Sequence, residues 1–196
     1  MKSSSQNIVI ACDMDDTIEY LLIAWISWLN KEYSYNVRYY DVKDWDLQKS
    51  FPKLTWEQIF TPLSMQNFWK TVKPMQDAIH YIKLLIDEGF NFHIVTSSYY
   101  DTIKYKFEEV LFKYFPFIDK NKIIVCHEKQ LIRCDVLIDD GPHNIEGPYI
   151  GILKDVRHNH DYVCPNNVYR CHCWKMIYFK IHELFPEIEQ KELISF

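Results

Sequence analysis

Short, almost purely apolar runs alternate along the chain with longer segments in which apolar residues recur at helical spacing. The first kind predicts strands buried on both faces, as in a parallel sheet, and occupies residues 8–12, 91–95, 122–126 and 136–138, with a weaker fifth run at 149–153. The second kind predicts helices and occupies residues 18–33, 77–88, 101–115 and 167–184. Strands that alternate with helices indicate an α/β fold, with a Rossmann-like parallel sheet and helices on both faces.

Residues 35–73 show neither period. This stretch is rich in aromatic residues, carries Pro52 and Pro62, and is interpreted as short helices joined by loops. A strand–helix–strand step needs only about 30 residues, so we expect the excess to form a small helical cap inserted after the first strand. The predicted division is a core domain of residues 1–18 and 74–196 and a cap subdomain of residues 19–73. A cap excludes water and selects the substrate.

Composition narrows the class of protein. The chain has 196 residues, of which 48% are hydrophobic and 25% charged, and its net charge is -5. These values predict a sizeable core, and the lack of a Lys/Arg block argues against binding a nucleic acid polymer. No run approaches the roughly 18 apolar residues of a membrane span, and the first run is too short for a signal-peptide core. We therefore expect a cytoplasmic protein whose six cysteines are free thiols.

Short clusters of polar residues, with carboxylate or hydroxyl side chains, follow three of the predicted strands: DMDDT, TSS and DDG. In such sheets, ligands bind beyond the carboxyl ends of the strands at a topological switch point, so Asp13 and Asp15 are expected to meet Asp139 and Asp140 there. Clustered carboxylates need a counter-charge, and oxygen ligands without a matching His/Cys set favour Mg²⁺. Each motif alone also fits an ordinary turn or helix cap, and Lys129 alone fits a solvated surface lysine. The three motifs and Lys129 together, in this order, indicate a phosphate and metal site.

These motifs resemble those of the haloacid dehalogenase superfamily and, within it, the 5'(3')-deoxyribonucleotidases and their bacterial relatives. The matching residues are Asp13-Met14-Asp15-Asp16-Thr17, Thr96 after NFHIV, Lys129 in HEKQLIRCD, and Asp139-Asp140 in VLIDD. The segments VKPMQDAIHYIKLLIDEGFNFHIVTSS and DVLIDDGPHNI are also similar to the family, and the resemblance is weakest over residues 33–71. Two features depart from it: Asp16 stands where the nucleotidases often have Gly, and Lys122 lies close enough to compete with Lys129 for the family lysine.

The resemblance implies a two-step hydrolysis of a phosphoric monoester. Asp13 acts as the nucleophile and forms an aspartyl-phosphate, while Asp15 protonates the leaving group and then activates water. The implied ligands of Mg²⁺ are Asp13, the backbone carbonyl of Asp15, and Asp139. The remaining implied residues are Asp140 and Asn144 in support of the metal, and Thr96, the backbone of Ser97 and Lys129 around the phosphate.

The substrate is expected to be a small phosphomonoester, with a nucleoside monophosphate favoured over a sugar phosphate. That preference rests on twelve aromatic residues of the predicted cap, most of which should form its core while the rest offer a stacking surface for a base: Trp25, Trp28, Tyr33, Tyr35, Tyr39, Tyr40, Trp45, Phe51, Trp56, Phe60, Phe68 and Trp69. A non-catalytic phosphate- or metal-binding regulatory protein is disfavoured by the complete motif set. A polynucleotide end-phosphatase is disfavoured by the acidic charge. Homo-oligomerisation stays open.

A group of cysteines and histidines near the carboxyl end raises the alternative of a zinc site: His158, His160, Cys164, Cys171, His172 and Cys173. Their spacing fits none of the usual structural zinc patterns. The favoured interpretation is a loop followed by a helix with partly buried cysteines, whose residues Trp174, Ile177, Tyr178 and Ile181 face the core.

Overall fold

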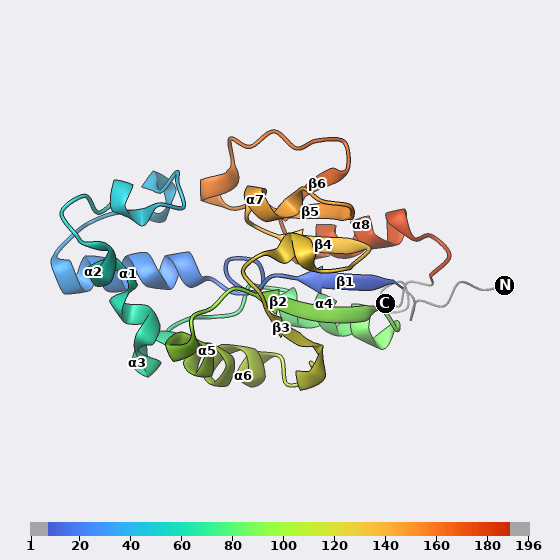
Figure 1. Cartoon of the computed structure of the whole chain (residues 1–196), viewed down its shortest axis with the longest axis horizontal. Coiled ribbons are helices and arrows are strands. Elements are labelled where there is room, and N and C mark those ends of the chain that lie inside the picture. The colour runs from blue at the N-terminus through green and yellow to red at the C-terminus, as the bar shows by residue number, and fades with distance from the viewer. Residues whose placement is uncertain (1–7, 189–196) are drawn as a thin grey trace.

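The computed structural model describes residues 8–188 and contains a six-stranded parallel sheet (Figure 1). The strand order is β3-β2-β1-β4-β5-β6. The strands are β1 (Val9–Cys12), β2 (Asn91–Thr96), β3 (Ile123–Val125), β4 (Val136–Asp139), β5 (Ile150–Lys154) and β6 (Val168–Cys171). This arrangement confirms the predicted α/β class, and the five strands expected from apolar runs are all present.

Strand β1 occupies the centre of the sheet. It pairs in parallel with β2 through Val9 and Asn91 and with β4 through Ile10 and Val136. The chain leaves β1 toward β2 on one side and later returns to β4 on the other, which makes the carboxyl end of β1 the topological switch point. The residues that follow β2, β1 and β4 are therefore neighbours.

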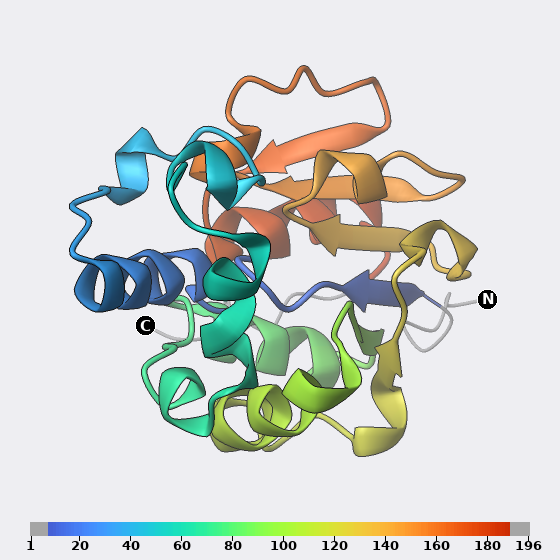
Figure 2. The same cartoon turned by 60° about the vertical axis from the view of Figure 1, so that its left-hand side comes forward.

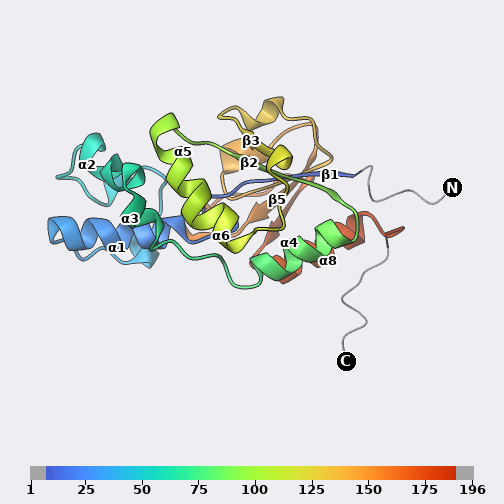
Figure 3. The same ribbon diagram turned by 90° about the horizontal axis from the view of Figure 1, so that it is seen from below.

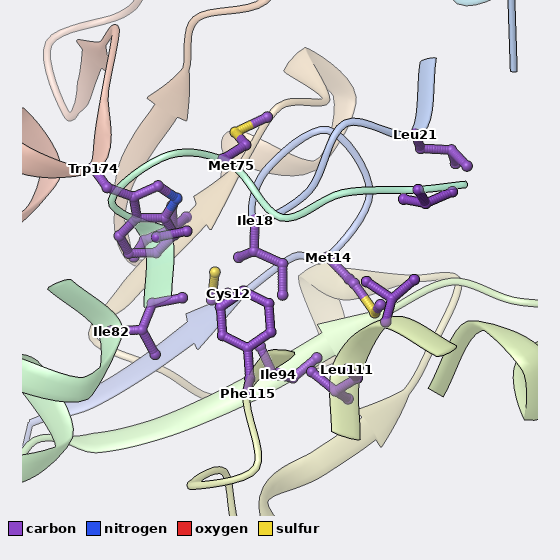
Figure 4. Close-up of a cluster of buried hydrophobic side chains, with 14 of the residues drawn as sticks. Cys12, Met14, Ile18, Leu21, Met75, Ile82, Ile94, Leu111, Phe115 and Trp174 are labelled. Atoms are coloured by element: carbon purple, nitrogen blue, oxygen red, sulfur yellow. The ribbon is translucent and has the colours of Figure 1, made fainter. Parts of the chain in front are cut away.

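The two faces of the sheet are covered unequally. One face packs against four helices, α4 (Ala78–Asp87), α5 (Tyr100–Lys106), α6 (Phe112–Tyr114) and α8 (Trp174–Leu184) (Figure 3). The close-up of this cluster shows side chains from β1, the segment after it, and α8 packed together, among them Cys12, Met14, Ile18 and Trp174 (Figure 4). The other face carries the short α7 (Pro142–Ile145) and loop segments that include Ile132, Tyr162 and Cys164.

Strand β6 corrects the prediction of one helix over residues 167–184. Only the first and last residues of the strand VYRC are buried. The strand lies at the edge of the sheet, so it lacks the continuous apolar run from which the inner strands were predicted. The helix begins at Trp174, and the expected core-facing residues of this helix, among them Ile177 and Ile181, are buried as predicted.

Two other helices differ from their predicted bounds. The first begins at Leu21 rather than at residue 18, because residues 18–20 pair with residues 73–75 instead of joining the helix. Tyr20 N–H donates to the Lys73 carbonyl at 2.9 Å, and Met75 N–H donates to the Ile18 carbonyl at 2.8 Å. The segment predicted as one helix over residues 101–115 is helical from 100 to 114 but contains a π-helical turn at Phe107–Leu111.

The predicted short helices and loops of residues 35–73 are confirmed. After α1 (Leu21–Tyr33) come α2 (Trp56–Phe60) and α3 (Gln66–Trp69), with 3-10 turns at Tyr39–Asp41, Leu47–Lys49 and Thr61–Ser64. These helices lie beyond the carboxyl ends of the strands (Figures 1 and 2). Within residues 8–188, no helix has both the length and the apolar character needed to cross a membrane.

Candidate active site

Three neighbouring strands deliver the predicted site residues to one edge of the sheet. Asp13 directly follows β1, and its backbone N–H donates to the Ile138 carbonyl of β4 at 2.8 Å. Thr96 is the last residue of β2, and Asp139 is the last of β4. The side chains of Asp13, Thr96 and Asp139 are all buried, so the sheet topology brings the three sequence motifs together.

Lys129 forms a bridge between two of these carboxylates. Its Nζ atom lies 2.5 Å from Asp13 Oδ1 and 2.7 Å from Asp139 Oδ2. Although burial acts to lower it, the carboxylates of Asp13 and Asp139 raise the pKa of Lys129. The competing candidate, Lys122, instead donates to Asn91 at 2.6 Å, at the amino-terminal ends of β3 and β2. The structure thus brings Lys129 into the site and keeps Lys122 away from it.

Lys106 is a site residue that the sequence analysis missed. Its ammonium group donates to Asp15 Oδ2 and to Thr96 Oγ1, at 2.6 Å each, and to the Ser97 carbonyl at 3.3 Å. The side chain is only 1% exposed. A signal was present, because Thr102, Lys106 and Val110 recur every four residues and share the buried face of the helical segment.

Three buried carboxylates can supply ligand atoms that lie within 4.8 Å of one another: Asp13, Asp139 and Asp140. Burial raises the pKa of Asp13, and Asp139 and Asp140 raise it further against the opposing effect of Lys129. Burial, with Asp139 next in importance, likewise raises the pKa of Asp140. Such a cluster of oxygen donors has more negative charge than Lys129 can balance, so the residues present fit a hard divalent cation.

The two adjacent aspartates at the end of β4 have different surroundings. Asp139 Oδ1 accepts hydrogen bonds from Gly141 N–H at 2.8 Å and from Asn144 Nδ2 at 3.2 Å, and Oδ2 contacts Lys129. Both oxygens of Asp139 are therefore engaged by protein groups. Asp140 has no lysine partner, and its Oδ2 has no hydrogen-bond partner among the described residues. Asn144 lies beside Asp139, and its role in support of the metal stays a prediction.

Asp16, which departs from the family pattern, has a structural role. Its backbone adopts φ of 49°, in the left-handed region that favours glycine and that Asp tolerates better than most residues. Both carboxylate oxygens accept from Leu22 N–H, at 3.1 and 3.2 Å. The carboxylate thus caps the first turn of α1, whose own N-cap residue, Tyr20, makes no side-chain cap.

A cavity of about 290 Å³ opens over these residues. Its polar floor includes Asp13, Asp15, Asp140, Lys106 and Lys129, and Ser97 adds a hydroxyl that is 2.6 Å from His127 Nδ1. Thr96 is fully buried beneath this floor. The opposite wall comes from residues 19–73 and is rich in aromatic side chains: Trp25, Trp45, Trp56, Phe60 and Trp69. The space combines a charged end with an aromatic wall.

Among the described residues, the histidines and cysteines near the carboxyl end are not gathered into a group of three or more potential metal ligands. In residues 8–188 the Asp13, Asp139 and Asp140 group is the only set of three or more potential ligands close enough to hold a metal. His160 and His172 instead contact Asp155, at 3.7 and 2.7 Å, beside Arg170. These two histidines are therefore paired with a carboxylate and are not gathered with the cysteines.

Comparison with known structures shows the fold. A haloacid dehalogenase-like hydrolase from Burkholderia xenovorans LB400 is similar with a TM-score of 0.60 and 11% identity, over 91% of this chain and 98% of that one. A hydrolase of the same superfamily from Deinococcus radiodurans R1, crystallised with bound phosphate and sodium, has a TM-score of 0.59 and 11% identity, over 93% and 97%. The magnesium-bound hydrolase YfnB from Bacillus subtilis has a TM-score of 0.56 and 14% identity, over 89% and 98%.

Comparison of sequences shows the family. A 5'(3')-deoxyribonucleotidase from Bacillus subtilis (strain 168) is 30% identical over 176 residues, covering 88% of this chain and 98% of that protein. A protein of the same name from Clostridium acetobutylicum is 31% identical over 152 residues, covering 76% and 83%. The family described as "5' nucleotidase, deoxy (Pyrimidine), cytosolic type C protein" matches residues 7–184. With that match and the geometry of its strand-end motifs, the chain belongs to this nucleotidase family of phosphoric monoester hydrolases, and its fold is that of the haloacid dehalogenase-like hydrolases.

Proposed function

We propose that the chain is a Mg²⁺-dependent phosphatase that removes phosphate from (deoxy)nucleoside monophosphates through an aspartyl-phosphate on Asp13. One observation carries the proposal. Asp13 and Asp15 lie at the floor of an aromatic-walled cavity, and each is paired with its own buried lysine, Lys129 and Lys106. This arrangement combines a nucleophile, a proton carrier and positive charge for the phosphate at one end of the cavity.

The ligands we assign to Mg²⁺ are the carboxylates of Asp13 and Asp140 and the backbone carbonyl of Asp15. Asp139 was expected as a ligand from the sequence, but its oxygens are engaged by Lys129, Gly141 and Asn144. We therefore assign Asp139 to holding Lys129 in place and Asp140 to the metal. When bound, the cation neutralises phosphate oxygens and polarises the phosphoryl group. The magnesium in the related hydrolase YfnB supports this choice of metal.

The chemistry is carried by the two aspartates. A carboxylate oxygen of Asp13 attacks phosphorus as the bond to the leaving oxygen breaks, and Asp15 gives its proton to that oxygen. In the second step Asp15 takes a proton from a water molecule, whose oxygen attacks phosphorus. The bond between phosphorus and Asp13 then breaks, which releases inorganic phosphate, restores the carboxylate of Asp13 and leaves Asp15 protonated for the next turnover.

Four further residues position the groups that react. Lys129 and the backbone of Ser97 hold phosphate oxygens, since both line the floor of the cavity. Thr96 is buried beneath them, and its hydroxyl fixes Lys106 at 2.6 Å. Lys106 in turn fixes the carboxylate of Asp15. Fixed charges in a partly closed site provide most of the stabilisation in phosphoryl transfer.

Residues 19–73 act as a cap over this site, and residues 74–188 with the first strand form the core. The chain enters and leaves the cap side by side, where Tyr20 pairs with Lys73 and Ile18 with Met75. Three of the exposed cap aromatics, Trp45, Trp56 and Phe60, line the cavity. They offer flat surfaces on which a base can stack, and the nucleotidase names of the relatives support a nucleotide substrate.

The proposal is tested by measuring phosphate release from deoxynucleoside monophosphates, ribonucleoside monophosphates and sugar phosphates with Mg²⁺. We expect the highest kcat/KM with a nucleotide. A higher value with a sugar phosphate than with every nucleotide would assign the same chemistry to a different substrate. Absence of phosphate release from the whole panel would contradict the enzymatic proposal itself.

A further inference from the structure

We propose that His158 is a positioning residue that orients the carboxylate of Asp140 for the metal ion. This inference rests on the proposed Mg²⁺-dependent function and adds a residue that no strand-end motif contains. His158 belongs to a 3-10 turn, Arg157–Asn159, which follows β5 and comes from a different part of the chain than the other site residues.

The contact between His158 and Asp140 is close and fully enclosed. His158 Nε2 lies 2.8 Å from Asp140 Oδ2, and the two side chains are 2% and 1% exposed. The two atoms are not aligned as in a hydrogen bond, and neither has another hydrogen-bond partner among the described residues. Buried polar atoms without partners are costly. A small rotation of the imidazole satisfies both atoms at once, so each is the natural partner of the other.

The type of partner distinguishes Asp140 from the other carboxylates at the site. Asp13 and Asp139 contact Lys129, and Asp15 contacts Lys106. An imidazole can donate a hydrogen bond without carrying a charge, whereas a lysine brings a cation. Asp140 is thus held by a group that leaves its negative charge available to a metal ion. Metal-binding carboxylates are commonly oriented in this way by a neighbouring donor.

The position of His158 is fixed from the side of the core. The next residue, Asn159, donates from Nδ2 to the Asp140 carbonyl at 2.7 Å and to the Lys154 carbonyl at 2.8 Å. Arg170 donates to Asn159 Oδ1 at 2.9 Å. The turn that carries the imidazole is therefore tied to the backbone of the carboxylate it contacts.

The same turn is also held from the side of residues 19–73. The indole of Trp45 packs against the His158 imidazole, with ring centroids 4.8 Å apart. Arg157 donates from Nε to the Tyr40 carbonyl at 2.9 Å, and its N–H donates to Tyr39 Oη at 3.2 Å. Trp45 also lines the cavity. His158 thus lies between Asp140 and Trp45, which both line the cavity, and is held on both sides.

The test measures Mg²⁺ affinity directly, by calorimetric titration of the full chain after treatment with a chelator. H158F keeps a ring to pack against Trp45 but has no N–H, and we expect about 10- to 100-fold weaker Mg²⁺ binding. H158Q restores a donor of similar reach and should bind closer to the wild type than to H158F. The control is H160Q, which changes an exposed imidazole two residues away and should leave the affinity unchanged.

Kinetics separate positioning from a general loss of structure. H158F should lose activity at low Mg²⁺ and recover most of its kcat at saturating Mg²⁺, a rescue that a misfolded variant does not show. If H158F fails to fold, H158N replaces it, because its shorter amide cannot reach Asp140.

Three results would overturn the inference. The first is wild-type Mg²⁺ affinity in H158F or H158N, and the second is equal weakening in H158Q and H158F. Either of these, in an active wild-type enzyme, removes the role of His158 and leaves the proposed function intact. The third is a wild-type protein that binds no Mg²⁺, in which case the metal-dependent function fails together with the inference.

Discussion

The ammonium group of Lys106 lies 2.6 Å from the carboxylate of Asp15, although ninety-one residues separate the two in the chain. Lys106 comes from α5, which follows β2 in the chain, and also contacts Thr96 at the end of β2. The two aspartates of the first motif therefore have separate lysine partners, since Asp13 pairs with Lys129. This separation gives each carboxylate its own electrostatic environment.

We expect K106M to lower kcat by about 100-fold, the scale of losing one fixed electrostatic contact in an active site. The change leaves Asp15 without its cation and Thr96 without its donor. The matched control is K104M, which removes an exposed lysine from the same helix and should retain wild-type kcat. Steady-state kinetics on a nucleotide and on p-nitrophenyl phosphate provide the measurement. A K106M enzyme with unchanged kcat on both substrates would show that Lys106 only supports the fold.

Replacing either aspartate of the first motif should separate their roles. D13N removes the nucleophile, so no covalent phosphoenzyme should form and turnover should be abolished. D15N removes the proton carrier, and its kcat should fall by several orders of magnitude. Acid-quench trapping with labelled substrate, combined with steady-state rates, checks both. The control is D135N, an exposed aspartate before β4, and phosphoenzyme in D13N would contradict the assignment of the nucleophile.

Much of the fold and most of the site followed from the sequence because inner parallel strands are nearly pure apolar runs. Their ends are easy to locate, and the polar residues at the carboxyl ends of β1, β2 and β4 were therefore expected in one place. Asp13, Thr96 and Asp139 needed no knowledge of side-chain packing. Strand β6 was missed because an edge strand such as Val168–Cys171 mixes polar and apolar residues.

The residues that could not be predicted are those positioned by packing between distant segments. Lys106 sits among several charged residues of one helix, and most lysines in such a helix are solvated. His158 reaches Asp140 only through the turn after β5. The different surroundings of Asp139 and Asp140 depend on hydrogen bonds from Gly141 and Asn144, which no pattern of residue types specifies.

Asp16 should contribute to stability as a cap of α1. D16A loses the acceptor for Leu22 N–H and places Ala at a left-handed φ, and together these should reduce the free energy of unfolding by about 2 kcal/mol. D16N keeps an acceptor and tolerates this φ, so it should retain most of the stability. Chemical denaturation of the metal-free protein makes the comparison. Equal stability of D16A and the wild type would show that the cap contributes nothing.

The need for Mg²⁺ can be tested by removing the metal, and the assignment of its ligands can be tested by replacing Asp139 and Asp140 separately. Excess chelator should abolish activity, and added Mg²⁺ should restore it.

A ligand that binds only the folded state at one hundred times its Kd adds about 2.7 kcal/mol to the free energy of unfolding, so Mg²⁺ should raise the Tm. D140N should lose most of this rise. D139N should retain more of it, because we assign Asp139 to Lys129. Full activity in chelator, or a larger loss in D139N than in D140N, would contradict these assignments.

The aromatic wall of the cavity should set the preference for a nucleotide. Most of the twelve cap aromatics do not line the cavity, as was expected, but Trp56 lines it and is half exposed. Stacking of a base on an aromatic ring contributes about 1–3 kcal/mol, so W56A should raise KM for a nucleoside monophosphate by about 5- to 150-fold. Hydrolysis of p-nitrophenyl phosphate should change less, since its small leaving group reaches less of the wall.

The control for W56A is Y40A, which removes an exposed cap aromatic that is not among the residues lining the cavity and should leave both KM values unchanged. Equal effects of W56A on the two substrates would mean that the wall only closes the cavity, and the stacking surface would then have to be sought on Trp45 or Phe60.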